Sequence, residues 1–240
     1  MPIPWLHDDD LSFPAVETAL EDPDGLLAAG GDLTPARLLY AYSLGIFPWY
    51  NDDQPILWWS PNPRTVLQPS NLHLAKSFRK FLRKTTFECS INASFGQVMH
   101  HCRQSREQLE GSWISDDMEA AYNHLHQLGH AHSVEVWDKG ELVGGLYGIA
   151  IGKVFFGESM FSYRSNASKL ALHTLVQQLS AWDFTLIDCQ VATDHLLSLG
   201  AQAISRGEFS ARLATAVQAP NSHWPSPPIN QTDSDIPWPI

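Results

Sequence analysis

Apolar residues recur at helical spacing in two stretches of the chain. The two sets are Leu74, Phe78, Phe81 and Leu82, and then Leu172, Leu175, Val176 and Leu179. Spacings of three and four residues place each set on one face of an α-helix, and Asn166 can cap the second helix. Two more helices are predicted over 36–44, which follows Thr34 and Pro35, and over 118–128, because a glycine ends each stretch.

Strand patterns fill most of the interval between the last two helices. Residues 133–137 alternate between apolar and polar, and 142–151 and 154–161 follow after turn residues. Residues 185–191 form one more β-rich stretch. The order of helix, three antiparallel strands, helix and strand predicts an α+β, or mixed α/β, fold with helices packed on one sheet.

Local composition divides the chain into three parts. Residues 1–62 are rich in proline, glycine and aromatic side chains and are predicted to form a small N-terminal α/β domain. Residues 63–220 carry most of the periodic pattern and form the main domain. Residues 221–240 combine several prolines with polar residues and show no periodicity, so this tail is predicted to be disordered.

The composition is that of a globular protein kept in a reducing compartment. Of the 240 residues, 44% are hydrophobic and 17% charged. The three cysteines are few and far apart, and the acidic N-terminus lacks the apolar segment of a signal peptide. No stretch approaches the roughly 20 apolar residues that a membrane span needs. We therefore expect a soluble, cytoplasmic protein.

The charge is strongly negative, with one local exception. A net charge of −11 argues against a nucleic-acid partner. The exception is a basic helix face made of Lys76, Arg79, Lys80, Arg83 and Lys84. A solvated charged face is the plain interpretation of such a run. In so acidic a protein, however, this concentration of positive charge favours an anionic partner.

Polar residues on two apolar strands are the first candidates for chemistry. Asp188 and Gln190 lie two apart, so a regular strand projects both from one face and Cys189 from the other. They could orient a reacting group or merely bond to nearby backbone. Glu158 follows a run of apolar residues, where burial makes an unpaired charge costly. It is therefore either paired structurally or faces a cleft.

Other chemistries have weaker support. Cys189 and His195 could act as thiol and base, but an isolated cysteine more often behaves as a small apolar residue. The spacing of His124, His126, His130 and His132 is not that of a zinc helix. The chain has neither a Walker-type loop nor a GxGxxG motif between a strand and a helix. We expect no metal and no cofactor.

Six segments in a fixed order resemble one known family. They are GLLAAGGDL at 25–33, GIFPW at 45–49, ILWWSP at 56–61, GHAHSVEVW at 129–137, GESMFS at 157–162 and LIDCQ at 186–190. Together they are similar to the leucyl/phenylalanyl-tRNA–protein transferases, through nearly the whole chain up to about Trp224. The resemblance implies an acetyltransferase-like (GNAT-like) C-terminal domain after the small N-terminal domain.

The resemblance also implies an activity. This family moves Leu or Phe, less readily Met, from aminoacyl-tRNA to proteins that begin with Arg or Lys, which marks them for degradation. An aminoacyl ester is already activated, so the reaction needs neither ATP nor metal. Residues 163–169 lack the glycines with which acetyltransferases of this fold hold coenzyme A. The implied partners are aminoacyl-tRNA and acceptor proteins, and we expect a monomer.

Site residues follow from the resemblance. It places Asp188, Gln190 and Glu158 at the reacting centre, with Asp188 orienting Gln190 and Glu158 also suited to an Arg or Lys acceptor end. The implied apolar aminoacyl pocket consists of Leu146, Phe155, Met160, Leu172, Leu175, Leu179 and Ile187. Trp49 and Trp113 match aromatics that contact the terminal adenosine. The basic helix face matches the region expected to hold the acceptor stem.

Two other functions remain open from the sequence. One is a coenzyme A-dependent N-acyltransferase of the same fold. The other is a non-catalytic adaptor that binds tRNA or serves degradation. A histidine-metal hydrolase is a more distant third, which metal analysis of the purified protein would test.

Overall fold

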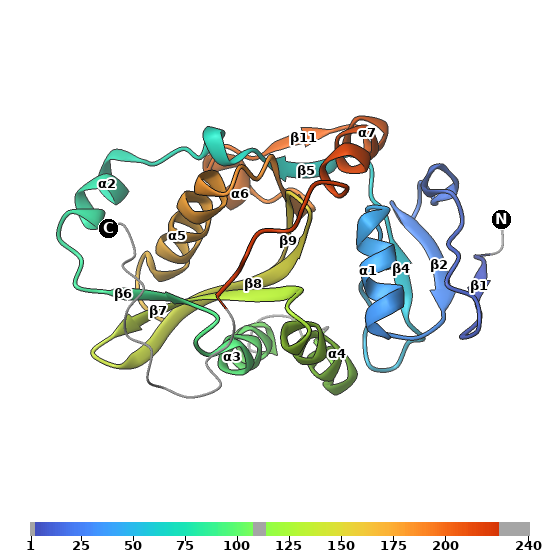
Figure 1. Cartoon of the computed structure of the whole chain (residues 1–240), viewed down its shortest axis with the longest axis horizontal. Helices are drawn as coiled ribbons and strands as arrows, with labels where there is room; N and C mark the ends of the chain where they lie inside the picture. The colour runs from blue at the N-terminus through green and yellow to red at the C-terminus, as the bar shows by residue number, and fades with distance from the viewer. Residues whose placement is uncertain (1–2, 108–113, 226–240) are drawn as a thin grey trace.

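The computed structural model describes residues 3–107 and 114–225, which form two β-sheets with helices packed against them (Figure 1). The smaller sheet has the strand order β1-β2-β4-β3, and the larger has the order β11-β5-β10-β9-β8-β7-β6. The chain passes from one sheet to the other between Trp59 and Arg64. The predicted domain boundary after residue 62 lies within this crossing. The mixed α/β architecture is confirmed.

The smaller sheet belongs to the first part of the chain. Its strands are β1 (Trp5–Leu6), β2 (Leu26–Gly30), β3 (Phe47–Pro48) and β4 (Leu57–Trp59). Helix α1 (Pro35–Ser43) begins as predicted, with Thr34 accepting a hydrogen bond from the Arg37 N–H and proline in its first turn. In Figure 1 this helix lies between the smaller sheet and the rest of the molecule.

The larger sheet mixes antiparallel and parallel pairs. Its strands are β5 (Arg64–Leu67), β6 (Glu88–Ile91), β7 (Ala131–Asp138), β8 (Glu141–Ile151), β9 (Val154–Ser162), β10 (Leu186–Gln190) and β11 (Gln202–Ile204). Strands β7, β8 and β9 form the predicted antiparallel meander. Strand β10 pairs parallel with β9 and antiparallel with β5, so it connects the meander to the first strand of the larger sheet.

Helices cover both faces of the larger sheet. They are α2 (Lys76–Leu82), α3 (Phe95–Glu107), α4 (Asp116–Gln127), α5 (Ala167–Ala181), α6 (Asp194–Ser198) and α7 (Arg206–Ala216). Helix α5 packs on one face through its leucines, and α3 and α4 pack on the other (Figure 1). The core on the α3 and α4 side continues into the smaller sheet through Leu38 and Trp58.

Several elements differ from the prediction. The sequence reading omits α3, although Phe95, Val98, Met99 and Cys102 give it a buried helical stripe. It also omits β5, because four buried residues are too few to show alternation. Asn166 does precede α5, but it has a left-handed φ of 69° and its side chain makes no capping hydrogen bond. The cap prediction was therefore right in position and wrong in mechanism.

The segment after α7 packs across the sheet instead of leaving it. The Asn221 side chain accepts a hydrogen bond from the Gly152 N–H at 2.8 Å. The Trp224 ring stacks on His132, with 3.9 Å between ring centroids. Contacts of this kind contradict disorder for residues 221–225, because the indole stacked on the imidazole buries apolar area that offsets the ordering entropy. Residues 226–240 lie outside the described part of the chain.

In 3–107 and 114–225, no helix combines the length and the apolar character that crossing a bilayer requires.

Candidate active site

The candidate site lies where the parallel strands β9 and β10 stop pairing. Regular pairing joins Leu186 with Val154, Ile187 with Phe155, and Asp188 with Phe156. Beyond Asp188 and Phe156 no further pair joins the two strands. Glu158 and Gln190 follow immediately on the two strands, so their side chains can meet where the strands part.

Both strands are irregular at this point. The pairing of β8 with β9 shifts so that Gly157 and Ser159 face Gly148 and Tyr147, which leaves Glu158 as the extra residue. The pairing of β5 with β10 shifts between Asp188 and Gln190. Bulges re-aim side chains and are frequent beside active sites. They explain why residues from both strands converge on one spot.

Asp188 is held by a buried arginine. The Nε and Nη2 atoms of Arg64 donate to the two carboxylate oxygens of Asp188 at 2.8 and 2.6 Å, and Nη1 donates to the Gly45 carbonyl at 3.0 Å. The guanidinium lies 4.8 Å from the centre of the Phe47 ring and 4.6 Å from that of Phe209. Two parallel hydrogen bonds of this kind fix a carboxylate in place.

The backbone of Gln190 depends on that carboxylate. The Gln190 N–H donates to Asp188 Oδ1 at 2.9 Å. Gln190 has a φ of 60°, a left-handed conformation that few residues other than glycine adopt. The regular alternation from which the sequence placed Asp188 and Gln190 on one face is interrupted here. The side chain of Gln190 is nevertheless aimed at Glu158, to which its amide Nε2 donates at 3.0 Å.

Glu158 is surrounded by neutral hydrogen-bond donors. The Tyr42 hydroxyl donates to Oε1 at 2.7 Å, and the Tyr122 hydroxyl donates to Oε2 at 3.2 Å. The two hydroxyls also contact each other. Tyr42 comes from α1 and Tyr122 from α4, so both parts of the chain build this site.

Burial dominates the ionisation of this group. It raises the pKa of Glu158 from 4.5 to about 7, although the hydrogen bonds from Tyr42 and Tyr122 act in the opposite direction. The nearby charge of Asp188 raises this pKa further and that of Arg64 lowers it. Glu158 can therefore gain or lose a proton near neutral pH, which is the property of a general acid or base.

The predicted pocket residues gather on the other face of the sheet. Leu146, Phe155, Leu172, Leu175, Leu179 and Ile187 belong to one apolar cluster, and the half-buried Met160 packs against it. Phe155 and Ile187 pair across β9 and β10, directly before the point where the strands part. This cluster thus borders the site from the α5 side.

The candidate nucleic-acid contacts lie on the surface. Trp49 is 47% exposed, and its carbonyl accepts a hydrogen bond of 2.6 Å from the Trp59 indole. The five cations of the basic helix face, on and just after α2, are all exposed. Trp113 lies outside the described residues.

The alternative chemistries find little support. Burial raises the pKa of the Cys189 thiol to about 12, so this group stays neutral and is a poor nucleophile. His126 binds the Ala131 carbonyl and stacks on Phe95, and His132 lies under Trp224. Among the residues that the structure describes, no group of three His, Cys, Asp or Glu could hold a metal ion.

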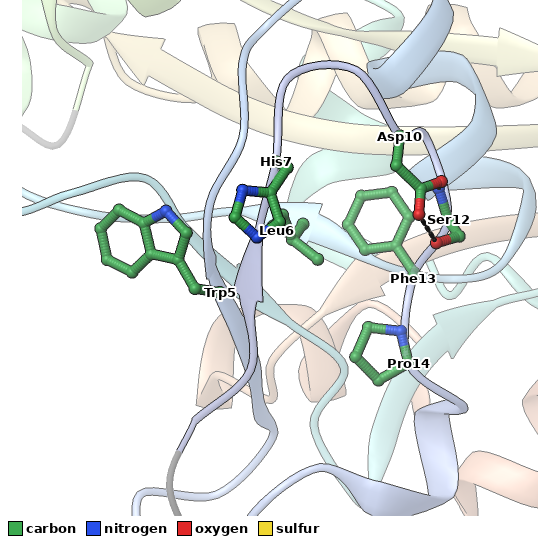
Figure 2. A pocket seen from close by; sticks show the side chains of 7 residues that line it. All are labelled: Trp5, Leu6, His7, Asp10, Ser12, Phe13 and Pro14. Carbon is green, nitrogen blue, oxygen red and sulfur yellow. Dashed lines mark hydrogen bonds between the residues drawn. The ribbon is translucent and has the colours of Figure 1, made fainter.

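A separate pocket lies on the smaller sheet (Figure 2). It is lined by Trp5, Leu6, His7, Asp10, Ser12, Phe13 and Pro14, and it shares no lining residue with the site at β9 and β10. Arg37 donates to the carbonyls of His7 and Asp10, and Ser12 donates to the Asp10 carboxylate. Its polar groups therefore serve to hold their own loop in place.

Sequence reasoning missed three residues of the site. Arg64 was not considered because it stands in an unpredicted strand. Tyr42 and Tyr122 lie on predicted helices, where a tyrosine is hard to distinguish from core. The only signal was that each tyrosine hydroxyl, once buried, needs a hydrogen-bond partner.

Comparison with known proteins gives two family matches. The model described as "Leucyl/phenylalanyl-tRNA protein transferase" matches residues 66–214, and that of the corresponding N-terminal domain matches 31–62. A leucyl/phenylalanyl-tRNA–protein transferase of Saccharophagus degradans is 56% identical over 90% of this chain and 88% of its own length. One from Pseudomonas entomophila is 56% identical over 90% and 96%.

Solved structures give a more distant likeness. An aminoglycoside acetyltransferase from an uncultured soil metagenomic sample covers 57% of this chain and 93% of its own, with 13% identity and a TM-score of 0.37. A likeness this distant carries no information on function.

Proposed function

The chain belongs to the leucyl/phenylalanyl-tRNA–protein transferase family, and from this premise we propose how its site carries out the reaction. As a member it is an aminoacyltransferase, which moves an amino acid from tRNA to a protein. The proposed donors are leucyl- and phenylalanyl-tRNA, with methionyl-tRNA used less readily. The proposed acceptor is the α-amine of a protein that begins with Arg or Lys. The product is marked for degradation, and the enzyme works as a cytoplasmic monomer.

One observation carries the assignment of the site. Gln190 donates its side-chain amide to Glu158 and its backbone N–H to Asp188 at the point where β9 and β10 part, beside a cluster of apolar side chains. Aminolysis of an activated ester needs such a place, because both substrates must be oriented and charge must be stabilised at the ester carbonyl. Gln190 supplies a fixed donor and acceptor. Asp188 orients Gln190 by accepting its backbone N–H.

The proposal also assigns the remaining contacts with the substrates. The apolar cluster on the α5 side accommodates a leucine or phenylalanine side chain, while its deeper members remain plain core. Trp49 stacks on the terminal adenosine together with Trp113. The basic helix face binds phosphates of the acceptor stem, which compensates for the net charge of −11.

The test follows the transfer of radiolabelled leucine from charged tRNA. We expect label on an acceptor protein that begins with Arg and none on the same protein beginning with Ala. Equal labelling of both proteins would disprove the acceptor preference. Acetyl transfer from acetyl-CoA, with none from leucyl-tRNA, would favour the coenzyme A-dependent alternative.

A companion variant separates catalysis from mere binding. The adaptor alternative predicts that Asp188→Ala leaves function intact, while loss of the basic helix face abolishes it. Our proposal predicts that Asp188→Ala loses transfer even where tRNA binding, measured by filter retention, is kept.

A further inference from the structure

Three oxygen-bearing side chains close a ring beside Gln190. We call it the carboxyl–tyrosine ring, and it consists of Glu158, Tyr42 and Tyr122. Tyr42 contacts Oε1 of Glu158 at 2.7 Å, Tyr122 contacts Oε2 at 3.2 Å, and the two tyrosine hydroxyls contact each other. Both tyrosines are completely buried and Glu158 is 8% exposed. Glu158 is therefore the only member of the ring through which a substrate can reach it.

Counting protons shows what the ring can do. Three oxygen-to-oxygen contacts need three protons, and the two hydroxyls supply only two. When Glu158 is ionised, both hydroxyls donate to it and no proton lies between them. When Glu158 is protonated, it donates to Tyr122, Tyr122 donates to Tyr42, and Tyr42 donates back to the carboxyl. The ring is complete with one added proton.

Hydrogen bonds from the hydroxyls of Tyr42 and Tyr122 also allow Glu158 to release the added proton. A charge-assisted bond to a carboxylate is about twice as strong as a neutral one. Each tyrosine therefore stabilises the ionised form against the cost of burial. Without them, an enclosed carboxyl would keep its proton at neutral pH and could not act as a base.

Other groups face Glu158 from each packed element. Gln190 on β10 donates its amide to Oε1. The pair formed by Asp188 on β10 and Arg64 on β5 acts on Glu158 with opposing charges. Around the two tyrosines, Phe156 lies edge-on to Tyr42, and Tyr147 of β8 lies edge-on to Tyr122. Both carboxylate oxygens of Asp188 are already bound by Arg64.

Building on the proposed function, we propose that Glu158 takes the proton that the attacking amine loses, and that Tyr42 and Tyr122 are positioning residues that allow it to take and return that proton. The amine nitrogen forms a bond to the ester carbonyl carbon, and one N–H proton passes to the Glu158 carboxylate. The bond from that carbon to the ribose oxygen breaks, and the same proton passes to the ribose oxygen. The products are an amide and an uncharged tRNA, with Glu158 ionised as at the start.

The test measures the single-turnover rate of leucine transfer from about pH 5 to about pH 9. Wild-type protein should lose rate on the acidic side, where Glu158 is protonated before the amine arrives. We call this fall in rate the acidic limb of the pH profile. Tyr42→Phe and Tyr122→Phe should each move the acidic limb to higher pH by about one unit, because each removes a hydrogen bond that favours the ionised carboxylate. Glu158→Gln should leave only the loss of rate that protonation of the acceptor's own α-amine causes, and should lower the rate at least about a hundredfold.

The matched control is Tyr40→Phe, which removes an exposed hydroxyl from the same helix as Tyr42. Its limb should stay in place. A limb that does not move, or that moves to lower pH, in both buried tyrosine variants would overturn the proposal. So would a Glu158→Gln protein with wild-type rates.

A second measurement covers variants that fold poorly. Infrared difference spectra of wild-type protein should show a protonated carboxyl band that titrates near neutral pH and is missing in Glu158→Gln. Absence of this band from the wild-type spectra would overturn the proposal. Failure of the proposed function is a distinct result, because it gives no leucine transfer at any pH.

Discussion

Two buried carboxylates lie on neighbouring strands of this site, and their partners are of opposite kinds. Asp188 is bound through both oxygens by the guanidinium of Arg64. Glu158 is bound by two hydroxyls and one amide, all of them neutral. Asp188 has a fixed countercharge, while Glu158 has donors that stabilise its charge without cancelling it.

This difference separates a positioning role from a proton-transfer role. A carboxylate paired with arginine gains nothing from binding a proton, because that would leave the guanidinium buried and unpaired. A carboxylate among neutral donors can change its charge at a modest cost, and burial raises the pKa of Glu158 to about 7. Pairs of acidic groups whose environments differ in this way are typical of acid–base sites.

The largest expected effect comes from breaking the pair at Asp188. Arg64→Met should lower the free energy of unfolding by about 3 to 5 kcal/mol, because it leaves a buried carboxylate without a countercharge. Urea unfolding at neutral pH measures this loss. Arg212→Met is the matched control, since Arg212 pairs with Glu208 on an exposed helix face and should cost less than about 0.5 kcal/mol.

A second variant shows that the charge is responsible. Adding Asp188→Asn to Arg64→Met should restore part of the lost stability, because it removes the uncompensated charge. An Arg64→Met protein within about 1 kcal/mol of wild type would contradict a structural role for the pair.

The next effect concerns Glu158 and the pH dependence of stability. Its pKa is about 7 in the folded protein and 4.5 as a free side chain. The carboxyl of Glu158 therefore binds its proton more tightly in the folded state than in the unfolded state. The stability that this protonation contributes is fully present below about pH 4.5 and is lost as the pH rises to about 7. The loss is at most about 3 kcal/mol.

Glu158→Gln removes this titration. The free energy of unfolding of Glu158→Gln, measured with urea at a series of pH values, should rise relative to that of wild type as the pH increases from about 4.5 to about 7. Above that range the difference between the two proteins should stay constant. Parallel curves for the two proteins across this range would show that Glu158 ionises equally well in both states.

Sequence periodicity predicted the framework of the site but not its partners. The meander, the helix after residue 166 and the strand at Asp188 were predictable, because long amphipathic patterns identify such elements. Arg64 was not, since its contact with Asp188 spans 124 residues and begins in a strand of only four. Tyr42 reaches Glu158 across 116 residues. Contacts between such distant positions depend on the pairing of β5 with β10 and on the packing of α1 beside β9, which no local pattern encodes.

Bulges were equally invisible to sequence reasoning. The family resemblance singled out Glu158, Asp188 and Gln190, but a regular strand would give their side chains fixed alternating directions. The extra residue in β9 and the register shift in β10 change those directions. Neither the glycine before Glu158 nor the residues around Cys189 identify a bulge by themselves, because the pairing partner decides where the extra residue goes.

The smallest expected effect tests the backbone that Asp188 holds. Gln190 has a φ of 60°, which costs an alanine about 1 kcal/mol more than a glycine. Gln190→Gly should therefore be more stable to urea than Gln190→Ala by about 1 kcal/mol, although both variants lose the amide and with it transfer activity. At Gln202, on strand β11 of the same sheet and without a positive φ, the order should be reversed, because glycine there only adds freedom to the unfolded chain. If glycine is no better than alanine at position 190, the left-handed backbone is not held in solution, and the link from Arg64 through Asp188 to Gln190 loses its physical basis.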